Sequence, residues 1–269
     1  MSNDPVHARL HFATALADEV AARILRVYRP SGVRFDTKAD GSPVTVADRD
    51  AESHIRARVD RAFPGDAFLG EEFGESPGNS GFRWIVDPID GTRAFVHGVP
   101  LFGTLIGIER NGRMVAGVLN LPAIAGGELL YAAVSEGCWH RVADAPPQRC
   151  RVSPVASLSE GLVCMTAPAD LNLHGMAPAF DRLARAAKGL RGWGDCFAFA
   201  MVATGRAEVS IDVKVHPWDV AALIPILTEA GGTITDFAGR TSIDAPSCVT
   251  TNGRVLPEML AILGGQPPG

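Results

Sequence analysis

Two carboxylates stand three positions apart in the stretch WIVDPIDGT, residues 84–92. The apolar start of this stretch predicts a buried strand that ends in Asp87, and Asp90 follows in a turn. Burying an aspartate costs free energy unless an opposite charge compensates it. Because carboxylate oxygens are the ligands that magnesium prefers, we expect both side chains to converge on bound cations. The plainer alternative is that Asp87 caps a turn and Asp90 is a solvated loop residue.

Gly91 and Thr92 follow the second aspartate directly. Pro88 stiffens the turn, and Gly91 lets the chain turn tightly, so that the amides beyond it can face an anion. The stretch therefore predicts a place where cations and an anion meet.

Further acids follow other apolar segments. Glu71 and Glu72 come after a short apolar run in FLGEEFG, and Asp219 lies in the first turn of a predicted helix in HPWDVAAL. Pro217 suits that helix start. An acid at a helix N-terminus is also favoured by the helix dipole, so Asp219 has this simpler reading, and Glu72 has the reading of a solvated side chain.

Asp48 stands three residues after Thr45, at the start of another predicted helix. This spacing matches a capping box, in which the two residues satisfy free backbone amides. Taken alone, Asp48 is therefore predicted to be a cap.

Two amphipathic helices are expected to support the acidic segment. Apolar side chains recur at helical spacing over residues 8–28 and 46–63. The connection at residues 29–43, which contains Lys38 and Asp40, predicts a polar loop.

The remaining segments predict two sheets. Five β-rich segments between residues 82 and 142 indicate an antiparallel meander, with Asn111 and Gly112 forming a hairpin turn. The second half alternates strands and helices, which is typical of a smaller α/β sheet. Its predicted strands are 161–167, 207–212 and 232–236, and its predicted helices are 177–188, 195–204 and 217–230. We expect a metal-binding α+β lobe over residues 1–145 and an α/β lobe over residues 146–269.

The composition excludes several classes of protein. The chain has 269 residues and a formal charge of −5, so we expect no nucleic-acid or membrane partner. Its five cysteines are odd in number and form no CxxC pair, which argues against a disulfide framework or a zinc site. Without a signal-like N-terminus or a long apolar run, the expected compartment is the cytoplasm.

Four segments together resemble the inositol monophosphatase family of magnesium-dependent phosphatases. They are SPVTVADRDAE at 42–52, GEE at 70–72, DPIDGT at 87–92 and HPWDVAA at 216–222. The resemblance covers about residues 36–236 and keeps the family's order of motifs. It implies a mixed α/β fold, a layered αβαβα sandwich with an antiparallel N-terminal sheet and a smaller mixed C-terminal sheet.

The resemblance also implies a metal centre. Glu71, Asp87 and the carbonyl of Ile89 would hold one Mg²⁺, and Asp87, Asp90 and Asp219 would hold a second. A third, weaker ion would lie near Glu71, and Mn²⁺ would substitute for Mg²⁺.

Other matching positions would handle the substrate phosphate and the attacking water. The resemblance gives the Gly91 and Thr92 amides to the phosphate, and it gives Asp48, Thr92 and Glu71 catalytic roles. Asp48 and Thr92 would position the water. His97 and His216 show no catalytic spacing; we expect His97 to pack near the site and His216 to shape a turn.

The substrate is indicated by two longer segments. GTRAFVHGVPLFGTLIGI at 91–108 and GWGDCFAFAMVATGRAEVSID at 192–212 are most similar to the histidinol-phosphate phosphatase branch of the family. The matching pocket residues would be Gly194, Asp195 and Asp212, with Arg191 as a further candidate. The simpler readings are a helix N-cap for Asp195, a solvated turn residue for Asp212 and an exposed side chain for Arg191.

The sequence thus predicts a phosphate monoester hydrolase that converts L-histidinol phosphate and water to L-histidinol and phosphate, in histidine biosynthesis. The alternatives are an inositol-1-monophosphatase, a 3′-nucleotidase-type phosphatase, or a family member that acts through protein or RNA contacts. The expected partner is a small phosphate ester, and the resemblance implies a homodimer.

Overall fold

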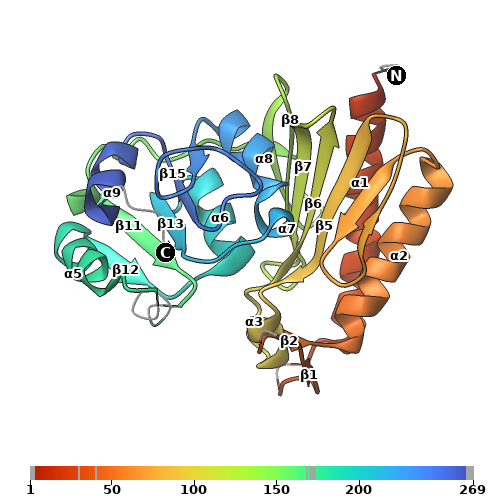
Figure 1. Cartoon of the computed structure of the whole chain (residues 1–269), viewed down its shortest axis with the longest axis horizontal. Helices are drawn as coiled ribbons and strands as arrows, with labels where there is room; N and C mark the ends of the chain where they lie inside the picture. Colours follow the sequence, from red (N-terminus) through yellow and green to blue (C-terminus); the bar gives the residue numbers. More distant parts are fainter. Residues whose placement is uncertain (1–3, 30, 40, 168, 170–173, 265–269) are drawn as a thin grey trace.

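Two long helices form the outermost layer on one side of the molecule (Figure 1). They are α1 (Pro5–Val27) and α2 (Val46–Ala62), close to the predicted ranges. Asp4 caps α1 because its carboxylate accepts the Val6 N–H at 2.9 Å. The computed structural model describes residues 4–29, 31–39, 41–167, 169 and 174–264.

The second layer is an eight-stranded sheet, in the order β10-β9-β8-β7-β6-β5-β3-β4. Neighbouring strands are antiparallel, as predicted, apart from β3 and β5, which run parallel. Asn111 and Gly112, both with positive φ, form the predicted hairpin turn between β6 and β7. The strands are β3 (Ala67–Gly70), β4 (Gly74–Ser76), β5 (Phe82–Asp90), β6 (Gly103–Arg110), β7 (Arg113–Leu121), β8 (Glu128–Ala133), β9 (Gly137–Val142) and β10 (Gln148–Arg149).

The remaining three layers come from the second half of the chain. Three helices lie between the two sheets: α6 (Asp195–Ala203), α7 (Pro217–Val220) and α8 (Leu223–Ala230). The second sheet has the order β12-β11-β13-β15-β14 and is mixed. Its strands are β11 (Leu162–Met165), β12 (Gly189–Arg191), β13 (Val209–Asp212), β14 (Thr233–Thr235) and β15 (Cys248–Thr251). With α5 (Ala177–Ala186) and α9 (Leu256–Leu263) outside, the layers read αβαβα, which confirms the predicted fold (Figure 1).

Three hydrophobic cores join the five layers. One core joins α1 and α2 to the first sheet, the second joins both sheets to α6 and α8 between them, and the third joins the second sheet to α5 and α9. The proposed division of the chain at residues 145 and 146 stays a prediction.

Two predicted elements differ in the structure. The connection at residues 29–43 contains a short hairpin of β1 (Asp36–Thr37) and β2 (Pro43–Val44). The single helix predicted at 217–230 is divided into α7 and α8. Pro225 explains the break, because it lacks the N–H that would bind the Ala221 carbonyl one turn earlier.

Two cysteines meet across the edge of the first sheet. Cys138 on β9 lies opposite Cys150, and their Sγ atoms are 2.7 Å apart, although all five cysteines are free and buried. Strand register brings this pair together, so residue spacing in the sequence gave no sign of it.

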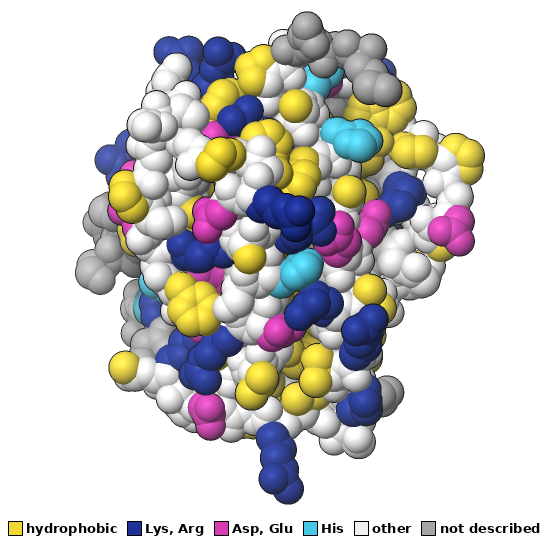
Figure 2. Space-filling view, turned by 90° about the vertical axis from the view of Figure 1, so that its right-hand side faces the viewer, with side chains coloured by type: hydrophobic (Ala, Val, Ile, Leu, Met, Phe, Trp, Pro, Cys, Tyr) yellow, Lys and Arg dark blue, Asp and Glu magenta, His cyan; other side chains and the backbone are white. Residues whose placement is uncertain are grey.

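The outer face of α1 and α2 carries charges of both signs. Figure 2 shows basic, acidic and histidine side chains intermixed over this side of the molecule. Arg23 pairs there with Asp50, and Glu19 contacts Arg58 and His54. Within the described residues, no helix is long and apolar enough to cross a membrane.

A buried ion pair anchors α1 to Asp66, the residue that directly precedes β3. The Asp66 carboxylate accepts two hydrogen bonds from Arg9, both at 2.7 Å, one from Ser80 at 2.6 Å and one from the Trp84 indole at 2.8 Å. The Arg9 guanidinium also lies over the Phe82 ring, 3.7 Å from its centroid. Both charges are therefore fully compensated by hydrogen bonds and by an aromatic face.

We expect Arg9→Met to lower the free energy of unfolding by about 3–5 kcal/mol, because it leaves the Asp66 carboxylate buried without its cation. Arg23→Met removes an exposed ion pair and should cost no more than about 1 kcal/mol. Urea unfolding of both variants at pH 7 measures the difference. Equal costs would show that the Arg9 pair is not an anchor.

Candidate active site

The two aspartates of the central motif lie on the same strand, which does not end at Asp87. β5 continues through Asp90, but its pairing with β6 shifts: Asp87 faces Leu105 and Asp90 faces Gly103. Three steps along β5 thus match two along β6, which is a bulge. Residues three apart on a regular strand point to opposite faces, so the extra residue is what returns Asp90 to the side of Asp87. The expected turn after Asp87 was wrong for this reason.

Hydrogen bonds hold the bulge in place. The Ile89 N–H donates to Asp87 Oδ1 at 2.9 Å, and the Thr104 hydroxyl donates to the Pro88 carbonyl at 2.8 Å. Pro88 has no N–H to lose from the ladder, so it suits a position where strand pairing is interrupted.

A third aspartate reaches the bulge from the layer between the sheets. One carboxylate oxygen from each of Asp87, Asp90 and Asp219 lies within 4.8 Å of the others. Asp219 is on α7, and its Oδ2 accepts the His216 N–H at 2.7 Å. The α7–α8 junction packs tightly on β7 at Gly117. A Cβ at this position would lie 2.1 Å from the Ala222 carbonyl oxygen, so only glycine allows so close an approach.

This crowding makes the three carboxylates hard to ionise together. Burial, reinforced by the neighbouring acids, raises the pKa of Asp87 and of Asp90 well above the usual range. Burial raises the pKa of Asp219 to about 7. Among the described residues, Asp90 Oδ2 is buried and has no hydrogen-bond partner. Converging, uncompensated hard oxygen donors are the set that a divalent cation fits.

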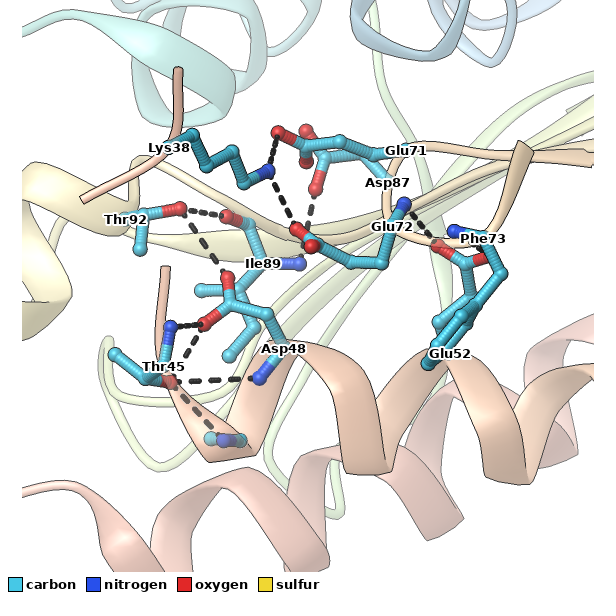
Figure 3. Close-up of polar contacts among 11 residues, drawn as sticks. Lys38, Thr45, Asp48, Glu52, Glu71, Glu72, Phe73, Asp87, Ile89 and Thr92 are labelled. Atoms are coloured by element: carbon cyan, nitrogen blue, oxygen red, sulfur yellow. Dashed lines mark hydrogen bonds and ion pairs between the residues drawn. The ribbon is translucent and has the colours of Figure 1, made fainter. Parts of the chain in front are cut away.

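Glu71 lies beside Asp87 and is contacted by a lysine (Figure 3). It follows β3, where its N–H donates to the Val86 carbonyl at 3.2 Å. Lys38 Nζ, from the segment after β1, is 2.7 Å from Glu71 Oε1 and 2.6 Å from Glu72 Oε1. Glu72 is therefore not the solvated side chain of the simpler reading; only 5% of its side chain is exposed. Asp40 lies outside the described residues.

Asp48 serves both as a helix cap and as a partner of Thr92 (Figure 3). Its Oδ2 accepts the Thr45 N–H at 2.8 Å and the Thr45 hydroxyl at 2.5 Å, which confirms the capping box. Its Oδ1 lies 3.3 Å from the Thr92 hydroxyl, which also donates to the Ile89 carbonyl at 2.9 Å. Burial raises the pKa of Asp48.

Gly91 makes the turn from β5 into the short helix α3 (Thr92–Val96). Its φ is +83°, and a Cβ there would lie 2.7 Å from the Leu101 carbonyl oxygen, so both conformation and space require glycine. Gly91 and Thr92 line one cavity of about 340 Å³ together with Glu71 and the three clustered aspartates.

A second cavity of about 80 Å³ opens beside this one and shares Asp90 and Asp219 with it. Asp195 and Asp212 line it, as does Thr166, whose hydroxyl donates to Asp212 and accepts the Asp195 N–H at 2.9 Å.

The predicted pocket residues differ in their placement. Asp212 ends β13 and is buried, so the reading as a solvated turn residue was wrong. Gly194, not Asp195, is the N-cap of α6. Gly194 packs against Thr166 so closely that a Cβ on Gly194 would lie 2.2 Å from the Thr166 Cα. Arg191 is exposed over the Trp193 ring and lines neither cavity.

Some nearby residues carried no signal in the sequence. Thr166 sits in no recognisable motif, and the structure alone places it between the two pocket aspartates.

His216 stacks on Trp218 with ring centroids 5.0 Å apart and lines the larger cavity. His97 is exposed at the end of α3, bonded to the Arg93 carbonyl, instead of packing near the site.

The five-layer fold and the buried acidic centre are those of a phosphatase family. A model of the inositol monophosphatase family matches residues 6–264, and the chain belongs to that family. Its members are metal-dependent phosphatases, so the chain is a hydrolase by class.

Individual relatives give a more specific comparison. The chain is 41% identical to a histidinol-phosphatase of Chlorobaculum parvum, over 95% of this chain and 96% of the relative. It is 38% identical to a histidinol-phosphatase of Mycobacterium tuberculosis, over 96% and 98%. Among solved structures, the extragenic suppressor protein suhB of Bartonella henselae superposes with a TM-score of 0.84 at 28% identity, over 95% of this chain and 98% of that one.

We expect Asp90→Asn to stabilise the metal-free protein, by about 1–3 kcal/mol, because it removes one charge from the crowded carboxylates and adds a donor beside them. The same change should reduce the rise in melting temperature on adding Mg²⁺. Thermal unfolding in excess chelator and in excess Mg²⁺ measures both effects. The exposed Asp144→Asn serves as the control; a less stable metal-free Asp90→Asn with an undiminished Mg²⁺ response would contradict the assignment.

Proposed function

We propose that the chain is a magnesium-dependent histidinol-phosphatase, which hydrolyses L-histidinol phosphate to L-histidinol and phosphate. The observation that carries this proposal is the acidic cavity lined by Asp195 and Asp212, which adjoins the aspartate cluster. Histidinol carries an ammonium and an imidazole, and both favour an anionic pocket over a neutral one. The names of the two closely related histidinol-phosphatases support the same substrate.

The metal ions in this proposal are held by the acids of the larger cavity. Glu71, Asp87 and the Ile89 carbonyl would hold one Mg²⁺, and Asp87, Asp90 and Asp219 a second, with a weaker third ion near Glu71. The buried Asp90 oxygen without a partner supports this arrangement. Bound there, such ions supply charge for activating water and for stabilising the leaving oxygen of the ester.

The chain's own residues position the water and the phosphate. The attacking water would donate a hydrogen bond to the Thr92 hydroxyl, whose own proton lies between the Ile89 carbonyl and Asp48. Thr45 fixes the Asp48 carboxylate, so this relay is rigid before the substrate arrives. Gly91 and Thr92 would offer their amides to the phosphate, and Glu71 would act beside them.

Inositol 1-phosphate is the second candidate substrate, because the family takes its name from that reaction. A nucleotide 3′-phosphate is a further alternative. The family resemblance also supports a homodimer whose second subunit completes the pocket.

A phosphate-release assay with Mg²⁺ compares the candidates directly. We expect histidinol phosphate to give the highest kcat/KM among histidinol phosphate, inositol 1-phosphate and adenosine 3′,5′-bisphosphate, and exhaustive chelation to abolish turnover. Asp87→Asn should lower kcat by at least about a hundredfold while the protein remains folded, because Asp87 is the proposed ligand of both ions. A parent protein that prefers inositol phosphate would reject the substrate, and turnover without metal would reject the mechanism.

Selectivity should depend on the two pocket aspartates. Asp195→Asn tolerates the left-handed backbone at that position, where φ is +50°, and Asp212→Asn retains an oxygen for Thr166. We expect each to raise KM for histidinol phosphate about tenfold and to change KM for a small aryl phosphate little, because the aryl ester has no cationic group. The exposed Asp181→Asn is the matched control. Equal losses on both esters would remove these aspartates from substrate recognition.

A further inference from the structure

Lysine is rare in this chain and concentrated at the site. Only Lys38, Lys188 and Lys214 occur among the 25 lysine and arginine residues. Two of these three, Lys38 and Lys214, line the cavity of about 340 Å³ that contains the acidic centre, and no arginine lines it among the described residues. A lysine ammonium is a compact point charge that binds phosphate without the fixed geometry of a guanidinium.

The two lysines differ in their position. Lys38 donates to Glu71 and Glu72 and lines the larger cavity but not the smaller one. Lys214 comes from the segment between β13 and α7, is exposed, and lines both cavities. The described residues common to the two cavities are Asp90, Asp219 and Lys214, so Lys214 supplies the only positive side chain at their junction.

This junction has a defined place along the proposed substrate. The larger cavity contains the Gly91–Thr92 turn, and the smaller one contains Asp195 and Asp212. A substrate that spans both would have its phosphate on the side of the turn and its cationic end beside the two aspartates. An ammonium at the junction attracts the phosphate and repels a positively charged group, so it favours this one orientation.

We infer that Lys214 binds the phosphate group of the substrate and sets the direction in which the substrate lies across the two cavities. This inference rests on the proposed function in so far as a phosphate ester must enter the site. The role of Lys214 differs from that of Asp195 and Asp212, which are proposed to bind the cationic end of histidinol phosphate. Lys214 would bind the phosphate, which every ester substrate and the inorganic product share.

The test compares Lys214→Met with the parent in the full chain, at saturating Mg²⁺. We expect KM for histidinol phosphate, KM for an aryl phosphate and the inhibition constant of inorganic phosphate all to rise about tenfold, the factor that corresponds to about 1.4 kcal/mol. The change in kcat should be smaller. Lys214→Arg should recover most of the affinity, because it restores the charge. Lys188→Met, which removes an exposed lysine outside both cavities, should match the parent.

Two outcomes would overturn the inference. An unchanged inhibition constant for phosphate in Lys214→Met means that the ammonium does not contact the phosphate. A lower KM for histidinol phosphate alone means that Lys214 acts only by repelling the substrate cation.

Failure of the proposed substrate is distinguishable from failure of this inference. If the parent prefers inositol phosphate, the histidinol assignment fails, and the response of the phosphate inhibition constant still decides the role of Lys214. If the parent hydrolyses no ester, calorimetric titration of the Mg²⁺-loaded protein with inorganic phosphate decides it. Weaker binding by Lys214→Met supports the inference, and equal binding, or none by the parent, overturns it.

Discussion

The crowding of carboxylates at the bulge of β5 is the constraint to which the surrounding structure responds. Asp87 and Asp90 are held on one strand, Asp219 approaches from α7, and Glu71 lies beside them. Like charges this close oppose folding when no cation is present, as the raised pKa values of the aspartates show. Such a cluster persists only when rigid elements hold it, and here it is held by the central strands of a large sheet and by a helix packed directly on that sheet.

Several local features serve this placement. The bulge turns Asp90 to the side of Asp87, and the Thr104 hydroxyl satisfies the carbonyl that the bulge exposes. Gly117 lets the α7–α8 junction lie against β7, which brings Asp219 within reach. On the other side, the buried Arg9–Asp66 pair fixes α1 to the start of β3, and Asp66 also accepts a hydrogen bond from Trp84 of β5. Together these features define the distances between acidic side chains that come from two neighbouring layers, the first sheet and the helices between the sheets.

Hydrophobic spacing was enough to predict the helices α1 and α2 and most strands, because each has a continuous apolar face, whereas the five-layer order was predicted only from the family resemblance. The aspartates that the motifs single out do lie together in the structure, since residue types and motif order are local properties, and their role as metal ligands stays a prediction. The bulge in β5 was not predicted, because a strand with an extra residue and a strand that ends have the same local sequence. Thr166 and the Cys138–Cys150 contact also escaped prediction, since both depend on register between segments far apart in the chain. The break between α7 and α8 could have been predicted from Pro225, but the helical spacing of apolar residues over 217–230 favoured a single helix.

The two cavities are lined by different parts of the chain. The first sheet and the turn into α3 supply Glu71, Asp87 and Gly91 to the larger cavity. Thr166 just after β11, Asp212 on β13 and Asp195 on α6 line the smaller one. Asp90 and Asp219 belong to both, so the two cavities meet at the clustered aspartates. Changes on the second sheet can therefore alter which alcohol is accepted while the bulge, and with it the hydrolytic chemistry, stays unchanged. This separation accounts physically for a family in which one acidic centre serves esters as different as those of inositol and histidinol.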